Sequence, residues 1–141
     1  MIVLLDTDHI SVMQYQDQAA ATLESHLAAF SGDAVRVSIV SFQEQARGWL
    51  AYLHRARTRE HILKGYAHLQ NLLVYYQFHE VMPFDESAMD EFQTLQKQRI
   101  RIGTSDLRIA AIAKANGAKL LSRNLRDFRH VPGLDVEDWT V

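Results

Sequence analysis

Three acidic patches stand where an apolar segment gives way to a predicted helix, and their side chains are suited to chemistry. The patches are Leu4-Leu5-Asp6-Thr7-Asp8, Ser41-Phe42-Gln43-Glu44 and Thr104-Ser105-Asp106-Leu107. Packing does not explain them, because a carboxylate at the end of a core segment loses hydration and needs a partner. If the patches meet in space, their negative charges require a cation. A divalent cation held in this way can promote cleavage of a phosphodiester bond.

The ions that suit this set of ligands are Mg²⁺ and Mn²⁺, which prefer hard oxygen ligands. A cation bound by Asp6, Glu44 and Asp106 would orient water, lower the pKa of that water and neutralise charge in the transition state. Two cations about 3.5–4 Å apart would contact both the attacking and the leaving oxygen. No protein nucleophile is then required, and Ser41 and Ser105 stand at helix starts, where serine caps are common.

Each of the three acids also has a structural explanation. Asp6 suits the turn after a strand, although Thr7 can cap the helix that follows and leave Asp6 free. Ser41 and Glu44 have the spacing of a capping box, in which the glutamate bonds back to the cap residue. Asp106 falls in the first turn of a helix, where the helix dipole favours negative charge. Local sequence alone leaves both roles open for Glu44.

The remaining ligands are also left open. Asn124 follows a predicted strand, Asp127 lies three residues further on, and Asp8 adds a carboxylate to the first patch. These three residues decide how many cations the site can hold. Candidate substrate contacts within or beside the patches are Thr7, Ser105, Arg47 and Arg123.

Strands and helices alternate along the chain, which predicts an α/β domain with a mostly parallel sheet. We expect strands at residues 2–5, 35–40, 81–82, 119–122 and 134–136. We expect helices at residues 7–15, 19–30, 42–56, 59–77, 87–99 and 104–116. Thr7, Ser41, Asp85 and either Thr104 or Ser105 are the expected caps, Thr58 separates the third and fourth helices, and Ser31-Gly32-Asp33 ends the second. Ligands of such sheets lie beyond the carboxyl ends of the strands, where the acidic patches would converge.

Length and composition predict a single domain over residues 1–141, with one substantial core. No apolar run approaches the roughly 20 residues that cross a bilayer. The opening segment lacks the basic start of a signal peptide, so we expect a cytoplasmic protein without a membrane partner. The absence of cysteine excludes disulfides, thiolate metal sites and cysteine nucleophiles.

Charge and histidine spacing add weaker signals. The formal net charge of −2 argues against nucleic-acid binding by bulk charge, although arginines cluster locally. His54, His61 and His68 recur every seven residues, which on one helix separates neighbours by about 10.5 Å, too far for shared ligation. We therefore expect these histidines to form a polar face or an interface edge.

Together these patches resemble the PIN-domain family and, within it, the VapC-type toxins of bacterial toxin–antitoxin pairs. The matching stretches are the first acidic patch, Ser38-Ile39-Val40-Ser41-Phe42-Gln43-Glu44, residues 100–111, residues 121–128, Val131-Pro132-Gly133-Leu134 and Glu137-Asp138-Trp139. Their order and spacing span nearly the whole chain.

The resemblance implies a three-layer α/β/α sandwich with a mostly parallel sheet of four to five strands. It implies a Mg²⁺- or Mn²⁺-dependent endoribonuclease acting on tRNA or rRNA, with Asp6, Glu44 and Asp106 as its core acids. It also implies a homodimer and an antitoxin whose tail occupies the active-site groove. Two departures are Asp8, where many relatives have asparagine, and Asn124, where many have a fourth acid.

Two other functions remain open at this point. Asp6-Thr7-Asp8 after an apolar strand also resembles the nucleophile motif of haloacid-dehalogenase-type phosphatases. Ile10 and the lack of a late Gly-Asp-x-x-x-Asp signature argue against that class. The second alternative is a PIN-like module that binds RNA or a protein without cutting, against which the intact set of three acids argues.

Overall fold

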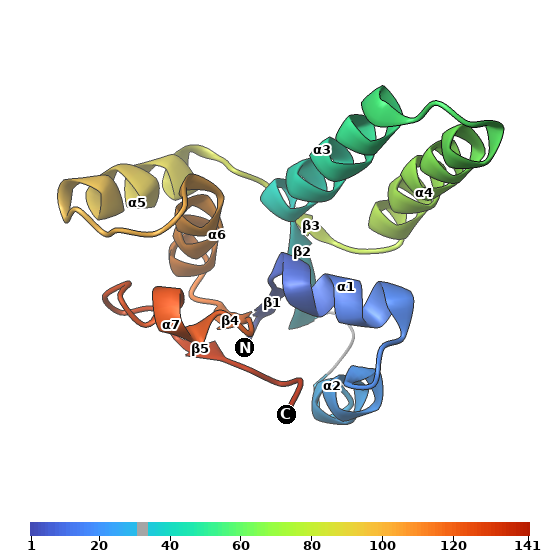
Figure 1. Cartoon of the computed structure of the whole chain (residues 1–141). Helices are drawn as coiled ribbons and strands as arrows, with labels where there is room; N and C mark the ends of the chain where they lie inside the picture. Colours follow the sequence, from blue (N-terminus) through green and yellow to red (C-terminus); the bar gives the residue numbers. More distant parts are fainter. Residues whose placement is uncertain (31–33) are drawn as a thin grey trace.

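The computed structural model describes residues 1–30 and 34–141, in which short strands alternate with helices (Figure 1). The strands are β1 (Val3–Leu5), β2 (Val35–Ser38), β3 (Val81–Met82), β4 (Lys119–Leu121) and β5 (Val136–Glu137). The helices are α1 (Thr7–Tyr15), α2 (Ala20–Leu27), α3 (Ile39–Arg55), α4 (Arg59–Gln77), α5 (Glu86–Lys97), α6 (Thr104–Ala115) and α7 (Leu125–Phe128). The expected stop at Ser31-Gly32-Asp33 lies outside the described residues.

The five strands form one parallel sheet in the order β3-β2-β1-β4-β5. The central strand β1 pairs with β2 through Val3 and Val35, and with β4 through Leu5 and Leu121. Because the strands are parallel, the carboxyl ends of β1, β2 and β4 lie at one edge of the sheet. The parallel sheet expected from the sequence is confirmed.

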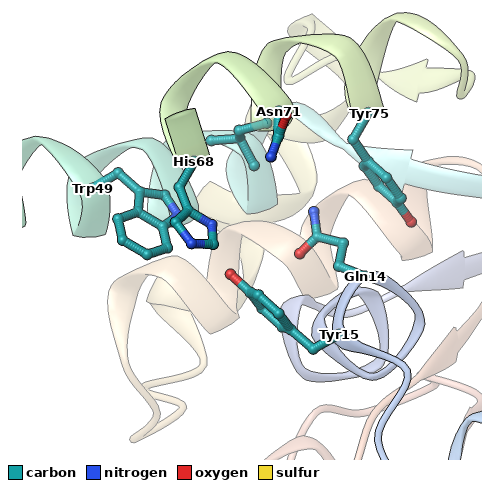
Figure 2. A pocket seen from close by; sticks show the side chains of 7 residues that line it. Gln14, Tyr15, Trp49, His68, Asn71 and Tyr75 are labelled. Atoms are coloured by element: carbon teal, nitrogen blue, oxygen red, sulfur yellow. The ribbon is translucent and has the colours of Figure 1, made fainter. Parts of the chain in front are cut away.

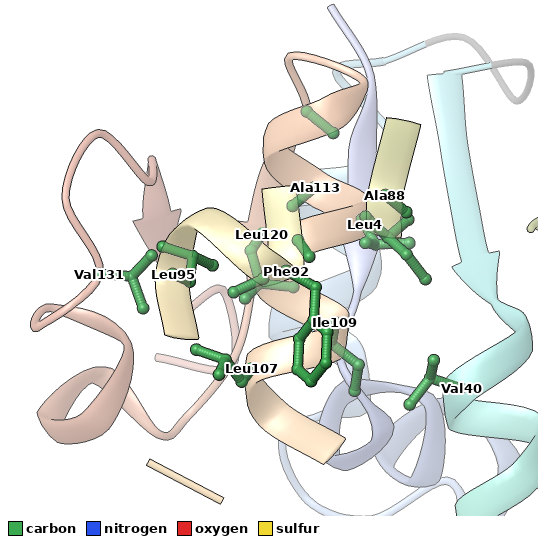
Figure 3. Close-up of a cluster of buried hydrophobic side chains, with 14 of the residues drawn as sticks. Leu4, Val40, Ala88, Phe92, Leu95, Leu107, Ile109, Ala113, Leu120 and Val131 are labelled. Carbon is green, nitrogen blue, oxygen red and sulfur yellow. The ribbon is translucent and has the colours of Figure 1, made fainter. Parts of the chain in front are cut away.

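Helices cover both faces of this sheet, so the fold is a three-layer α/β/α sandwich. On one face Leu4 and Leu120 pack with Phe92 of α5 and Ile109 of α6 (Figure 3). On the other face lies a second core of buried side chains that includes Val3, Leu5, Ile10, Leu23 and Leu72. Strand β1 is buried on both faces, which explains why its sequence is apolar without alternation.

The start of α3 differs from the prediction. Strand β2 ends at Ser38, and its Oγ accepts the backbone N–H of Ser41 at 3.0 Å, so Ser38 is the cap and α3 begins at Ile39. The run of β-branched residues to Val40 suggested a longer strand, but the side-chain cap ends it. Ser41 is buried in the first turn and does not form a capping box with Glu44.

Two other predicted caps are wrong. Asp6 caps α1, because its Oδ1 accepts the N–H of Thr7 at 2.8 Å, which leaves the Thr7 hydroxyl for other contacts. Gly103 precedes α6 and makes no side-chain cap, so neither Thr104 nor Ser105 holds that role.

The long helices α3 and α4 form a hairpin that extends beyond the sheet (Figure 1). Thr58 caps α4 as expected, and Gly65 lies where a Cβ atom would come within 2.5 Å of Leu53 Cδ2. The two helices therefore cross closely at a glycine. Among the described residues, no helix combines the length and apolar character needed to cross a membrane.

Candidate active site

The centre of the candidate site is Asp6, at the carboxyl end of β1. Its backbone N–H donates to Leu121 O at 2.9 Å, which extends the pairing of β1 with β4 by one residue. Its Oδ1 accepts from Thr7 N, and its Oδ2 accepts from the Ser122 hydroxyl at 2.7 Å. Both carboxylate oxygens are thus fixed, and the residue is only 6% exposed.

The pKa of Asp6 is raised from 3.8 to about 7, mainly because the side chain is buried and further because of the negative charges of Asp8 and Asp106. The hydrogen bonds from Ser122 and Thr7 act in the opposite direction without cancelling the effect. An aspartate in this position is costly to ionise unless a cation compensates it. The site therefore favours a positively charged ligand.

Glu44 is brought to the site by a hydroxyl bridge between α1 and α3. The Thr7 hydroxyl lies 2.9 Å from Glu44 Oε1 and 2.9 Å from Ser41 Oγ. A hydroxyl has one proton and an ionised carboxylate only accepts, so Thr7 donates to Glu44 and accepts from Ser41. This contact orients the carboxylate of Glu44 toward the start of α1.

Asp106 enters from the first turn of α6, and Asn124 joins it to Asp127. The Asn124 Nδ2 group donates to Asp106 Oδ2 at 3.3 Å and to Asp127 Oδ2 at 3.1 Å. Burial raises the pKa of Asp106, followed by the charges of Glu44 and Asp127. Asn124 and Asp127 are thus both present at the site, where Asn124 acts as a donor that separates two carboxylates.

Asp8 is held by the backbone of Arg123 and by His9, a residue that the sequence analysis did not single out. Its Oδ2 accepts from Arg123 N at 3.0 Å, and its Oδ1 lies 2.7 Å from Nδ1 of the buried His9. The Nε2 atom of His9 accepts the Trp139 N–H at 3.2 Å, so the proton is on Nδ1 and is donated to Asp8. The position of His9 beside an acidic patch was the only signal for this role.

Five carboxylates therefore share the acidic site, which we define as Asp6, Asp8, Glu44, Asp106 and Asp127. Within the described residues, no lysine or arginine lies within 4.0 Å of Asp6, Glu44, Asp106 or Asp127 as an ion pair.

Residues 1–30 and 34–141 hold no group of three acidic or histidine side chains arranged around a single ion position. Thr7 and Asn124 hold Glu44 and Asp106 in separate hydrogen bonds. The donor set itself, carboxylate oxygens with no cationic partner, fits a hard divalent cation.

The side chains of the four predicted substrate contacts lie in different surroundings. Thr7 contacts Glu44 directly, and Ser105 is half-buried beside Asp106. The Arg123 side chain donates from Nε to Thr140 Oγ1 at 3.0 Å and so faces the C-terminal segment, and Arg47 is exposed on α3.

The three regularly spaced histidines do not share a helix. His54 lies in α3, whereas His61 and His68 lie in α4. His68 stacks on Trp49 with ring centroids 4.1 Å apart, so it packs between the two helices of the hairpin.

The chain was compared with known families, proteins and structures. The family model for the PIN domain matches residues 3–134. Ribonuclease VapC1 of Rickettsia felis is 52% identical over 42 residues, 30% of this chain and 31% of the relative. The tRNA(fMet)-specific endonuclease VapC of Salmonella typhimurium is 33% identical over 64 residues, 43% of this chain and 48% of the relative.

These sequence matches span about a third to a half of the length of the curated relatives. The fold matches over the whole length: a structure of VapBC-1 from nontypeable Haemophilus influenzae has a TM-score of 0.74 at 22% identity and covers 100% of both chains. A match of the family model over residues 3–134, together with the parallel sheet and its acidic carboxyl edge, shows that this chain belongs to the PIN domain family.

Proposed function

We propose that this chain, a single PIN domain over residues 1–141, is a metal-dependent endoribonuclease and the toxin of a toxin–antitoxin pair. The observation that carries the proposal is the convergence of Asp6, Glu44 and Asp106 from three separate elements at one sheet edge, without a cationic partner among the described residues. Similarity to proteins named ribonuclease VapC and endonuclease VapC supports the reaction class.

The acidic site would hold Mg²⁺ or Mn²⁺ through Asp6, Glu44 and Asp106, with Asp8 and Asp127 at its margins. Such an ion lowers the pKa of water and stabilises negative charge on the phosphate oxygens. In the ligand-free protein the chain's own polar groups hold these carboxylates in separate hydrogen bonds, so binding of the ion would require their side chains to turn toward it. Positioning of ligands by such neighbours commonly affects metal affinity or activity 10–100-fold.

The polar neighbours have distinct tasks in this proposal. Thr7 orients Glu44, Ser122 fixes Asp6, and Asn124 keeps Asp106 and Asp127 at a set separation. In the ligand-free protein Asp6 retains a proton near neutral pH, so binding of a cation releases it. The chemistry needs no nucleophile from the protein.

Partners and compartment follow from the same proposal. The substrate would be tRNA or another structured RNA in the cytoplasm, and the regulator a cognate antitoxin that covers the acidic site. A homodimer completes the proposed assembly. The structural relative is a VapBC complex, which supports an antitoxin as partner. The family match gives no support to the phosphatase alternative.

The test is an RNA cleavage assay with purified protein and total tRNA in Mg²⁺, Mn²⁺ or EDTA. Cleavage should require the cation and disappear in Asp6→Asn. Asp90→Asn, which removes an exposed carboxylate on α5, is the matched control and should cleave as the unmodified protein does. Cleavage that persists in EDTA or in Asp6→Asn would refute the metal-nuclease proposal, and no cleavage in any condition would favour a binding module.

A further inference from the structure

A cavity of about 290 Å³ lies between α1, α3 and α4, away from the five carboxylates (Figure 2). We call it the aromatic cavity; its lining consists of Gln14, Tyr15, Trp49, His68, Asn71, Leu72 and Tyr75. Trp49 and His68 line one side, with their rings stacked on each other and nearly parallel at 6°. Tyr15 and Tyr75 lie at other sides of the same space (Figure 2). Its volume suits one small flat group rather than a bulky ligand.

Two carboxamides give this cavity a polar edge. Gln14 and Asn71 extend into the space from α1 and α4 (Figure 2). The Gln45 amide donates to Gln14 Oε1 at 2.8 Å, and the Tyr76 hydroxyl in turn donates to Gln45 Oε1 at 2.8 Å. The Gln14 Nε2 group also donates to Gln45 Oε1 at 3.4 Å, so Gln45 fixes the Gln14 carboxamide through both its oxygen and its nitrogen. Aromatic faces combined with fixed carboxamides match a nucleobase, which stacks through its face and forms paired hydrogen bonds through its edge.

A groove adjoins this cavity on the side of α1 and α3. The α1–α3 groove, about 350 Å³, is lined by Ser11, Tyr15, Gln45, Gly48, Trp49, Tyr52 and Arg55. It shares Tyr15 and Trp49 with the aromatic cavity. At its other end Ser11 follows Thr7 by one helical turn, and Gln45 adjoins Glu44. Since Thr7 bonds to Glu44, Ser11 and Gln45 mark the end of the groove that is nearer in sequence to the acidic site, and Tyr15 lies roughly 12 Å from Thr7 along α1.

Gly48 has no side chain, which leaves the α1–α3 groove open at this position. Glycine inside a helix costs about 0.5–1 kcal/mol relative to alanine, and a Cβ atom at Gly48 would meet nothing within 4 Å. Packing explains Gly65, where Leu53 is in the way, but it does not explain Gly48. Arg55 adds a positive charge at the end of the groove remote from the carboxylates.

We propose, on the basis of the proposed ribonuclease function, that the aromatic cavity binds one unpaired base of the substrate RNA. The backbone of that RNA follows the α1–α3 groove from the acidic site, with Arg55 near its phosphates. The face of the base stacks against the rings of Tyr15 and Tyr75. The edge of the base forms hydrogen bonds with the carboxamides of Gln14 and Asn71. The combination of aromatic faces with two carboxamides at the edge favours a base as the occupant.

The test measures binding rather than cleavage, in the Asp6→Asn protein, with a fluorescent short oligoadenylate and an abasic oligomer of the same length. Tyr15→Leu removes a stacking ring at a side chain that is 55% exposed, so the fold should survive. Tyr66→Leu, at an exposed α4 tyrosine outside the cavity, is the matched control. Asn71→Ala tests the polar edge.

Tyr15→Leu should bind oligoadenylate roughly 5- to 150-fold more weakly, as expected for loss of stacking on one base. It should bind the abasic oligomer as before, and Tyr66→Leu should leave both affinities unchanged. Equal weakening for both oligomers, or unchanged affinity of both Tyr15→Leu and Asn71→Ala for oligoadenylate, would overturn the proposal. Weakened binding of a co-purifying protein alone would assign the cavity to a protein partner instead.

Failure of the two proposals can be told apart. If the unmodified protein cleaves no RNA but Tyr15→Leu still loses base-dependent binding, the nuclease function fails and the base site stands. If cleavage is observed and Tyr15→Leu leaves base-dependent binding unchanged, the nuclease function stands and the base site fails.

Discussion

Replacing Asp6 by asparagine is expected to stabilise the folded protein above neutral pH while abolishing RNA cleavage. Asp6 is only 6% exposed and interacts with Asp8 and Asp106, so its ionised form is unfavourable in the ligand-free protein. Asparagine has nearly the same shape and no charge. The carboxamide oxygen of asparagine can still accept from Thr7 N, while its amide nitrogen can donate to the Ser122 hydroxyl.

The magnitude follows from the difference in pKa between the folded and unfolded states. In the folded protein the pKa of Asp6 is raised from 3.8 to about 7. Between these values the folded state binds a proton that the unfolded state does not, so stability decreases as pH rises and the loss is complete above pH 7. At 1.36 kcal/mol per unit the loss is about 4 kcal/mol. The altered hydrogen bonds of asparagine cost about 1 kcal/mol, which leaves a net gain of about 3 kcal/mol at pH 8.

The assay is urea and thermal unfolding of both proteins in EDTA from pH 4 to pH 8. A gain of this size corresponds to an increase in Tm of roughly 10 °C for a chain of this length. The histidines are common to both proteins, so the difference between the two pH profiles isolates Asp6. The reasoning is refuted if Asp6→Asn is less stable than the unmodified protein at pH 8, or if the difference between them does not grow from pH 4 to pH 8.

Three further predictions concern the groups around Asp6. Saturating Mg²⁺ or Mn²⁺ should stabilise the unmodified protein by about 2.7 kcal/mol at 100 times the Kd, as measured by thermal unfolding, and a shift of equal size in Asp106→Asn would contradict the ligand assignment. Thr7→Val, which removes the donor to Glu44, should lower metal affinity or kcat 10–100-fold in titration and cleavage assays while far-ultraviolet circular dichroism stays unchanged. His9→Leu should lower the free energy of unfolding by about 2 kcal/mol in urea because Asp8 loses one of its hydrogen bonds and the Trp139 N–H loses its acceptor, and an unchanged midpoint would show that these bonds contribute nothing.

Sequence alone determined the fold class, and it predicted three acids that the fold brings to one edge of the sheet. The apolar run at the start of the chain required a strand buried on both faces, and the alternation of strands with helices required a parallel sheet. Parallel topology then places the ends of β1 and β2 at one edge, so Asp6 and Glu44 could be expected to converge. Thr58 and Asp85 were correctly identified as caps, since each bonds to a backbone N–H three residues away.

Only the tertiary structure decided which group each polar side chain contacts. Locally, Ser41 and Glu44 satisfy a capping box, yet Thr7 competes for the same carboxylate from a helix 37 residues away in sequence. The contacts of Asp8 with Arg123 N and of Asn124 with Asp106 likewise depend on how the carboxyl ends of the strands meet. Local spacing fixes what a side chain can reach within its own helix, whereas hydrogen bonds across the sheet edge depend on the packing of distant segments. That is why the three acidic helix starts were visible in the sequence, while the pKa of Asp6 and the aromatic cavity between α1, α3 and α4 were not.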